Sequence, residues 1–304
     1  GGFACDIDCR SDEKEERMKT VVKLFWSSRP VSWINTAFPF AATYIFFTGQ
    51  VDAPLIIGTL FFLIPYNLLM YGINDVFDYE SDLRNPRKGG IEGALLDKSL
   101  HKVTIWSSVL LCLPFVAYLL IRGSLAANLF LLFALFTVLA YSAKGLRFKE
   151  IPFLDSLTSA SHFVNPMIFA ALFIGQNVFS APLLQSWLAF ACWAMASHAF
   201  GAVQDVKADR EGGLNSIATV IGARVTTHFA WILYLAAGLL MLSTPWPMNL
   251  AAIAAVPYLL ILLPHWNITD DTCESANRGW RKFIWLNYFA GFVVTQLLIV
   301  SAIL

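Results

Sequence analysis

Acidic side chains gather in two short stretches, each of which ends a long run of apolar residues. In residues 71–82, YGINDVFDYESD, the amide of Asn74 precedes the carboxylates of Asp75, Asp78 and Asp82. These carboxylates stand at positions i, i+3 and i+7, so a helix presents all three on one face. This first acidic motif therefore predicts an acidic stripe at one end of a helix.

A second acidic motif has the same design. In residues 200–213, FGAVQDVKADREGG, Gln204 and Asp205 again end an apolar run, and Asp209 follows at i+4. Unpaired carboxylates that face one another repel by about 1 to 4 kcal/mol per close pair, so a cation should neutralise them. Hard oxygen ligands with open positions for phosphate oxygens suit Mg²⁺. The two motifs predict a magnesium site that carries a diphosphate, with Asp75, Asp78, Asp82, Asp205 and Asp209 as ligands and Asn74 beside them.

Two alternatives need no such chemistry. Nearby lysines could neutralise the acids and leave a salt-bridged rim, although a rim does not explain the matching amides Asn74 and Gln204. A cation transporter would also place acids inside a membrane. A transporter favours acids near the middle of the membrane on broken helices, whereas these acids end their helices beside basic residues.

The composition predicts an all-α integral membrane protein. The chain has 304 residues, 57% hydrophobic and only 14% charged, with a mean hydropathy of +0.61. Residues 1–18 form a polar lead, either processed or of engineered origin, and residues 19–304 form one predicted domain. Nine apolar segments are long enough to span a bilayer, which takes about 17 to 25 residues. They lie near 31–49, 53–73, 103–121, 124–142, 153–175, 183–203, 225–243, 247–266 and 283–303.

The basic residues assign an orientation to these nine segments. Of the 21 Lys and Arg residues, all except Arg122 fall on one side of the nine-span topology. The positive-inside rule then places the N-terminus in the cytoplasm. Both acidic motifs lie at the cytoplasmic ends of their spans, so the site should face the cytoplasm.

Basic and polar residues near the motifs are candidates for contact with the diphosphate, because Arg and Lys bind phosphate oxygens. Alternatively, each basic residue only reports topology. The candidates besides Asn74 are Arg29, Arg87, Lys88, Tyr141, Lys144, Arg147, Lys149, Lys207 and Arg210.

Polar residues within apolar segments are candidates for the wall of a cavity below the acids. Span five carries Asp155, Thr158, Ser159, His162 and Asn165 near one helical face. Asn35, Asn67 and His162 are the cavity candidates that we retain. For His162 and His198 we expect interhelical hydrogen bonds, because a departing diphosphate can itself remove a proton.

The two motifs resemble the NDxxDxxxD and DxxxD signatures of the UbiA superfamily of intramembrane prenyltransferases. The loop 141–149, YSAKGLRFK, is similar to a third recurring element of that family, and the likeness covers nearly all of the chain after residue 20. It implies nine helices around a central cavity open to lipid, with Mg²⁺ as the cofactor. Residues 27–40, 71–94, 201–224 and 266–280 further resemble the actinobacterial elongases of carotenoid chains, the lycopene elongase or flavuxanthin synthase group.

This resemblance implies a specific reaction. Asp75, Asp78, Asp205 and Asp209 would hold Mg²⁺ on dimethylallyl diphosphate, and both ends of lycopene would be prenylated to give an acyclic, flavuxanthin-like fifty-carbon carotenoid. A quinone, haem or chlorophyll-type acceptor is the alternative. The implied setting is the bacterial cell membrane, with lipid and another lipid-soluble polyprenyl acceptor as further possible partners. We expect no nucleic-acid partner. Other carotenoid enzymes are possible partners, but no sequence motif encodes such an association.

Overall fold

The computed structural model describes residues 3–83 and 96–304, apart from the side chains of residues 3–14, 81, 82 and 284. In this part of the chain every regular element is helical. The first half comprises α1 (Phe3–Ser27), η1 (Pro30–Ser32), α2 (Trp33–Thr48), α3 (Ala53–Leu63), α4 (Pro65–Asn67), η2 (Leu68–Gly72), α5 (Ile73–Phe77), α6 (Tyr79–Asp82), η3 (Lys98–Leu100), α7 (His101–Arg122), α8 (Leu125–Ser142) and η4 (Phe148–Glu150). The second half comprises α9 (Leu154–Phe173), α10 (Ala181–Val203), α11 (Val206–Glu211), α12 (Ile217–Leu242), η5 (Met248–Ala254), α13 (Ala255–Leu262), η6 (Leu263–His265), η7 (Asp270–Ala276), α14 (Asn277–Trp280) and α15 (Phe283–Ile303).

Each of the nine predicted spans coincides with helical structure, which confirms an all-α membrane protein. Among the described residues, seven helical segments are long and apolar enough to cross a membrane. The other two predicted spans correspond to α2, which has only 16 residues, and to α9, which carries the polar residues of span five. Nine spans and a cytoplasmic N-terminus therefore stay predictions.

Local signals explain where several helices begin. The carboxylate of Asp52 accepts the backbone N–H of Leu55 (3.0 Å) at the start of α3, which satisfies one of the unpaired donors at a helix N-terminus. Ser216 and Thr219 form a reciprocal capping box at the start of α12. These caps order the helix ends at both faces of the bundle.

The first acidic motif follows an irregular stretch of helix. The segment from Ala53 to Phe77 passes from α3 through α4 and the π-helical turn η2 before it becomes α5. Pro65 begins α4 and leaves the carbonyl of residue 61 without its usual helical partner. Wide π-helical turns often occur at functional sites, and this one ends at Gly72, directly before α5, which carries Asn74.

Two buried clusters hold the bundle together. One joins α2, α3, α7, α8 and α9 around large rings such as Phe61, Phe62 and Tyr66. The other joins α10, α12 and α13 around Tyr234 and Tyr258, whose rings stack with centroids 5.0 Å apart. The cavity lies between these two halves.

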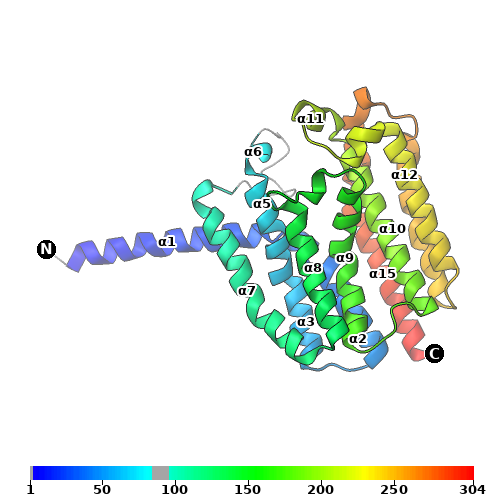
Figure 1. The fold of residues 1–304 in the computed structure, drawn as a ribbon, viewed down its shortest axis with the longest axis horizontal. Coiled ribbons are helices and arrows are strands. Elements are labelled where there is room, and N and C mark those ends of the chain that lie inside the picture. Colours follow the sequence, from blue (N-terminus) through cyan, green and yellow to red (C-terminus); the bar gives the residue numbers. More distant parts are fainter. Residues whose placement is uncertain (1–2, 84–95) are drawn as a thin grey trace.

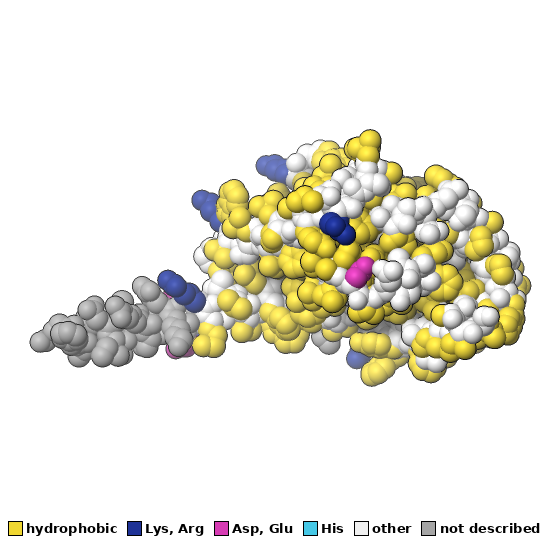
Figure 2. Space-filling model, turned by 90° about the horizontal axis from the view of Figure 1, so that it is seen from below, with side chains coloured by type: hydrophobic (Ala, Val, Ile, Leu, Met, Phe, Trp, Pro, Cys, Tyr) yellow, Lys and Arg dark blue, Asp and Glu magenta, His cyan; other side chains and the backbone are white. Residues whose placement is uncertain are grey.

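Charge is unevenly distributed over the ends of the bundle. Figure 1 shows α5, α6 and α11 at the same end, with α1 projecting to one side. Figure 2 shows the opposite end, where hydrophobic side chains predominate and few charged side chains are visible. The acidic motifs thus share the charged end, as the sequence predicts.

Candidate active site

The two acidic motifs line a single cavity of about 2400 Å³. Asn74 and Asp78 come from the first motif, at α5, and Asp205 and Asp209 come from the second, at the junction of α10 and α11. Each motif sits where a long apolar helix ends, because the carboxylates favour the charged end of the bundle. The structure therefore brings together residues about 130 positions apart, as the motif spacing suggests.

In the first motif, Asp75 lies behind the cavity wall, where it is only 2% exposed. Its Oδ1 accepts a hydrogen bond from Nη2 of Arg29 (3.0 Å), and its Oδ2 accepts one from Oγ of Ser27 (2.9 Å). Arg29 also packs over the ring of Tyr71, 4.3 Å from its centroid, which is a cation–π contact. Arg29, itself a lining residue, is thus held at the cavity beside the first motif.

Asp78 accepts a hydrogen bond from Nζ of Lys149, and Nη2 of Arg147 lies 3.6 Å from its Oδ1. Both cations follow α8 and line the cavity. Burial lowers the pKa of Lys149, while the charge and hydrogen bond of Asp78 act in the opposite direction. Arg147 in turn bonds Glu150, and that hydrogen bond is the main reason why its pKa is raised.

The basic residues of the second motif point elsewhere. Lys207 donates to the backbone carbonyl of Asp271 (2.9 Å). Arg210 donates to the carboxylate of Asp270 (2.6 Å) and to the carbonyl of Thr219. Neither Lys207 nor Arg210 lines the cavity, so we remove both from the proposed diphosphate contacts. Their role in this structure is to join α11 to η7 and α12.

The remaining predicted residues divide into three groups. Tyr141, Asn35 and His162 line the cavity, whereas Lys144 is exposed and lies outside its lining. Asn67 is also outside the lining: it is fully buried and its amide donates to Oγ1 of Thr36 (2.7 Å) and to two backbone carbonyls. Asn67 therefore holds α4 against α2 instead of lining the cavity. Arg87, Lys88 and the side chain of Asp82 fall outside the described residues.

The oxygen atoms present suit a hard divalent cation. The side-chain Oδ1 of Asn74 is buried without a hydrogen-bond partner among the described residues, and Asn74 lines the same cavity as the motif carboxylates Asp78, Asp205 and Asp209. An unpartnered oxygen of this kind costs free energy unless a ligand satisfies it. Among the described side chains, however, no three His, Cys, Asp or Glu residues converge closely enough to hold a metal by themselves. A metal at this end would need ligand oxygens from a diphosphate as well.

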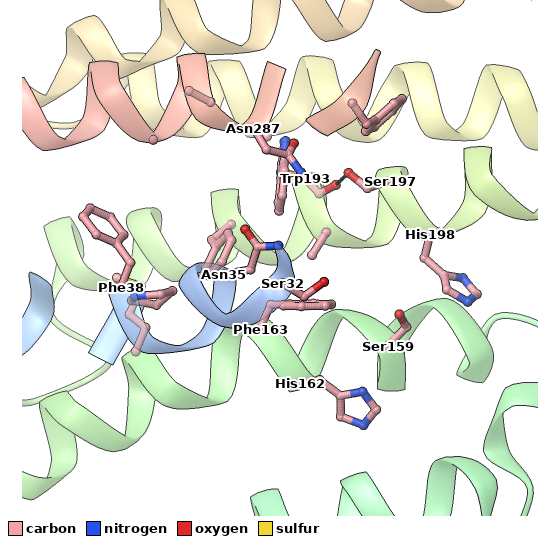
Figure 3. Close-up of a pocket in the computed structure, with 18 of the residues that line it drawn as sticks. Ser32, Asn35, Phe38, Ser159, His162, Phe163, Trp193, Ser197, His198 and Asn287 are labelled. Atoms are coloured by element: carbon pink, nitrogen blue, oxygen red, sulfur yellow. Dashed lines mark hydrogen bonds between the residues drawn. The ribbon is translucent and has the colours of Figure 1, made fainter. Parts of the chain in front are cut away.

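Away from the acids the cavity wall becomes apolar and aromatic. Figure 3 shows Phe38 and Asn35 of α2 and Phe163 of α9 on one side, with Trp193 of α10 and Asn287 of α15 on the other. The lining continues to the far end of α10 and to the turn before η5, with residues such as Pro182 and Trp246. Because α10 has 23 residues, this path is about 35 Å long. It can hold a long apolar molecule whose reacting end reaches the acids.

Sequence reasoning missed three residues of this end: Ser27, Glu150 and Asp270. Ser27 and Glu150 orient the cations and acids of the first motif, and Asp270 binds Arg210 beside the second. No local pattern marks Ser27 or Asp270, because each acts through a partner that the fold supplies. Glu150 lies three residues from Arg147, and that local spacing of opposite charges could have identified it.

Comparison with known proteins agrees with this geometry. Residues 36–287 match the UbiA prenyltransferase family. A Dietzia protein named C(50) beta-cyclic carotenoids biosynthesis protein LbtBC is 51% identical over 98% of this chain and 69% of its own length. The lycopene elongase/hydratase of Corynebacterium glutamicum is 50% identical over 93% of this chain and 98% of its own length.

Solved structures show the same fold at low sequence identity. A UbiA homolog from Archaeoglobus fulgidus, bound to GPP and Mg²⁺, has a TM-score of 0.64 at 19% identity and covers 90% of this chain and 99% of its own. The same homolog bound to DMAPP and Mg²⁺ has a TM-score of 0.62 at 20% identity. The chain belongs to the UbiA prenyltransferase family and is an integral membrane prenyltransferase.

Proposed function

We propose that this enzyme transfers a dimethylallyl group from dimethylallyl diphosphate to the ends of lycopene and releases diphosphate. The product would be an acyclic, flavuxanthin-like carotenoid of fifty carbons. One observation carries the proposal: a single cavity connects two acidic motifs at the charged end to a long aromatic wall. Two relatives, 51% and 50% identical in sequence to this chain, carry names from carotenoid synthesis and support this class of acceptor.

The proposed ligands of Mg²⁺ are Asp78, Asp205 and Asp209, which line the cavity with Asn74 beside them, together with Asp75 and Asp82. Asp75 lies behind the wall, so it would reach the ion only by giving up its hydrogen bond to Arg29. When bound, the ion would neutralise charge on the leaving diphosphate. Arg29, Arg147 and Lys149 line the same end and are placed to bind phosphate oxygens. We therefore propose that these three cations pair with the acids in the resting enzyme and with the diphosphate in the complex.

The walls below the acids serve the acceptor. A dimethylallyl cation that meets bulk water is lost to hydrolysis, so an enclosed apolar cavity favours transfer to the acceptor. Rings such as Phe163 and Trp193 face this space and stabilise positive charge through their π faces. We propose that lycopene enters from the bilayer, while the donor reaches the acidic end from the cytoplasm of a bacterial cell.

The test is expression in a lycopene-accumulating bacterial host, with pigments separated by chromatography and identified by mass spectrometry. We expect products heavier than lycopene by one and by two five-carbon units. Asp209→Asn should reduce their formation at least about a hundredfold, because a catalytic metal contributes several kcal/mol. Glu211→Gln is the matched control, since Glu211 is exposed on the same helix and lies outside the cavity lining.

Two further outcomes separate the parts of the proposal. In isolated membranes, chelation should abolish turnover and added Mg²⁺ should restore it; turnover that persists under chelation argues against the metal. Unchanged lycopene with the folded wild-type protein and donor present would overturn the carotenoid acceptor. A quinone, haem or chlorophyll-type acceptor would then be supplied in the same assay.

A further inference from the structure

A polar cluster lies below the acidic motifs where α8, α9 and α10 meet. The ring of His198 is held on both sides: Oη of Tyr141 lies 3.3 Å from its Nε2, and Oγ of Ser156 lies 3.0 Å from its Nδ1. Tyr141 and His198 both line the cavity. If Nδ1–H donates to Ser156, then Nε2 is the acceptor of the Tyr141 hydroxyl.

A buried carboxylate partly offsets the cost of placing positive charge on this buried ring. Asp155 is fully buried, and its two oxygens accept the backbone N–H groups of Ser156 (2.7 Å) and of Ile217 at the start of α12 (2.7 Å). It interacts electrostatically with His198. Because the two N–H groups hold Asp155 in place, its charge favours protonated imidazole without reorganisation.

The position of the cluster along α10 places it close to where the reaction would occur. His198 precedes Asp205 by seven residues along α10, which is about 10 Å along a helix. Figure 3 places His198 of α10 and Ser159 of α9 at the same end of the cavity, whereas the ring of His162 points away from them. The reacting carbons would lie between the acids and the aromatic wall, which is the level of Tyr141 and His198.

The proposed reaction leaves one proton to remove. The donor C–O bond breaks with its electron pair going to diphosphate, and the π electrons of the terminal double bond of lycopene form the new C–C bond. The resulting tertiary cation either loses a C–H proton to form a new double bond, or it takes up water and the added water loses a proton. Either route needs a proton acceptor beside the cation.

We infer that Tyr141 and His198 form the proton relay that ends this reaction. Oη of Tyr141 takes the proton from the cation or from the added water, and its own phenolic proton passes to Nε2 of His198. Tyr141 is the group that touches the substrate, and His198 acts through it. This inference rests on the proposed function, and it replaces the expectation that the diphosphate removes the proton.

The test uses Tyr141→Phe and His198→Gln in the full-length protein in membranes, with lycopene, dimethylallyl diphosphate and Mg²⁺ supplied. Carotenoid products, dimethylallyl alcohol and released diphosphate are measured together. Phe keeps the ring but removes the hydroxyl, and Gln keeps hydrogen bonding but accepts no proton. His228→Gln is the matched control, because His228 lies on α12 outside the cavity lining and bonds a backbone carbonyl.

Each variant should reduce carotenoid formation roughly a hundredfold, which is within the range for general base catalysis. Diphosphate release should continue, because a tertiary cation that keeps its proton reverts to lycopene and the dimethylallyl cation, which water captures as dimethylallyl alcohol. The double variant should be no worse than either single one. Wild-type product yields in His198→Gln would overturn the relay, as would equal losses of carotenoid and diphosphate release, which indicate a structural role. A wild-type enzyme that leaves lycopene unchanged would instead contradict the proposed function itself.

Discussion

The two acidic motifs face the same cavity, but the basic residues around them have different partners. At the first motif the cations come from distant segments and bind the acids directly: Arg29 binds Asp75 and Lys149 binds Asp78. At the second motif the cations within the motif, Lys207 and Arg210, bind η7 and α12.

This difference separates two roles for positive charge. A lysine or arginine that pairs with an acid inside the cavity can exchange that acid for a phosphate oxygen, because both partners are anionic oxygens. A cation that binds a loop outside the cavity instead fixes the position of its own helix. We therefore expect the cations at the first motif to bind the diphosphate, and the cations of the second motif to hold its helix in position.

Lys149→Ala gives the largest effect expected from this comparison. The variant removes a mostly buried cation that lines the cavity, and a lost hydrogen bond between charged groups costs about 1.5 to 3 kcal/mol. The KM for dimethylallyl diphosphate should rise roughly ten- to a hundredfold. Steady-state kinetics at several donor concentrations measure this change.

Lys207→Ala is the paired variant on the second motif. It removes an exposed hydrogen bond to a backbone carbonyl outside the cavity, so kcat/KM should change less than about twofold. If Lys207→Ala and Lys149→Ala raise KM equally, the distinction between the two motifs is wrong.

Gly222→Ala tests how the second motif is held. Gly222 interrupts α12 with φ 81° and ψ 161°, a backbone conformation open almost only to glycine, and Ala223 directly after it donates to Asp270 (2.7 Å). An added Cβ would also lie 3.2 Å from Oδ1 of Asp270. The variant should lower the free energy of unfolding by about 1 to 3 kcal/mol.

Denaturant unfolding in detergent measures that loss. Gly291→Ala is the control, because a Cβ there meets no heavy atom within 4 Å and Ala favours a helix interior over Gly. Equal stability of Gly222→Ala and the wild type would show that the break in α12 is not imposed by the backbone.

The smallest effect expected is a pH dependence at Asp270. The Ala223 N–H, followed by Arg210, holds the pKa of the Asp270 carboxyl below its usual value. The ionised carboxylate therefore stabilises the folded state, and this contribution is present above about pH 4 and is lost as the pH falls below that value. Wild-type protein should lose more thermal stability between about pH 6 and about pH 3 than Asp270→Asn does. Identical pH profiles for the two proteins would contradict this role.

Local sequence patterns were sufficient for much of the fold. Apolar runs of spanning length predicted helices at all nine ranges, because a bilayer requires every backbone group to be paired within a helix. The placement of Asp78 and Asp209 on one cavity followed from their positions at the ends of two such runs. Whether α2 and α9 cross the membrane was harder to assess. α2 has only 16 residues and α9 carries several polar side chains, so neither gives a clear signal of a membrane span.

By itself the sequence determined the helices, the membrane class, the family and the acidic end of the site, because these depend on residue types at short spacing. Only the tertiary structure decided which cations lie at that site. Arg29 and Asp75 are 46 positions apart, Lys149 and Asp78 are 71 apart, and Tyr141 and His198 are 57 apart. Nothing in the local chain distinguishes Lys149 from Lys207, since both follow an apolar run beside acids. Packing of the helices brings one into the cavity and directs the other to a loop.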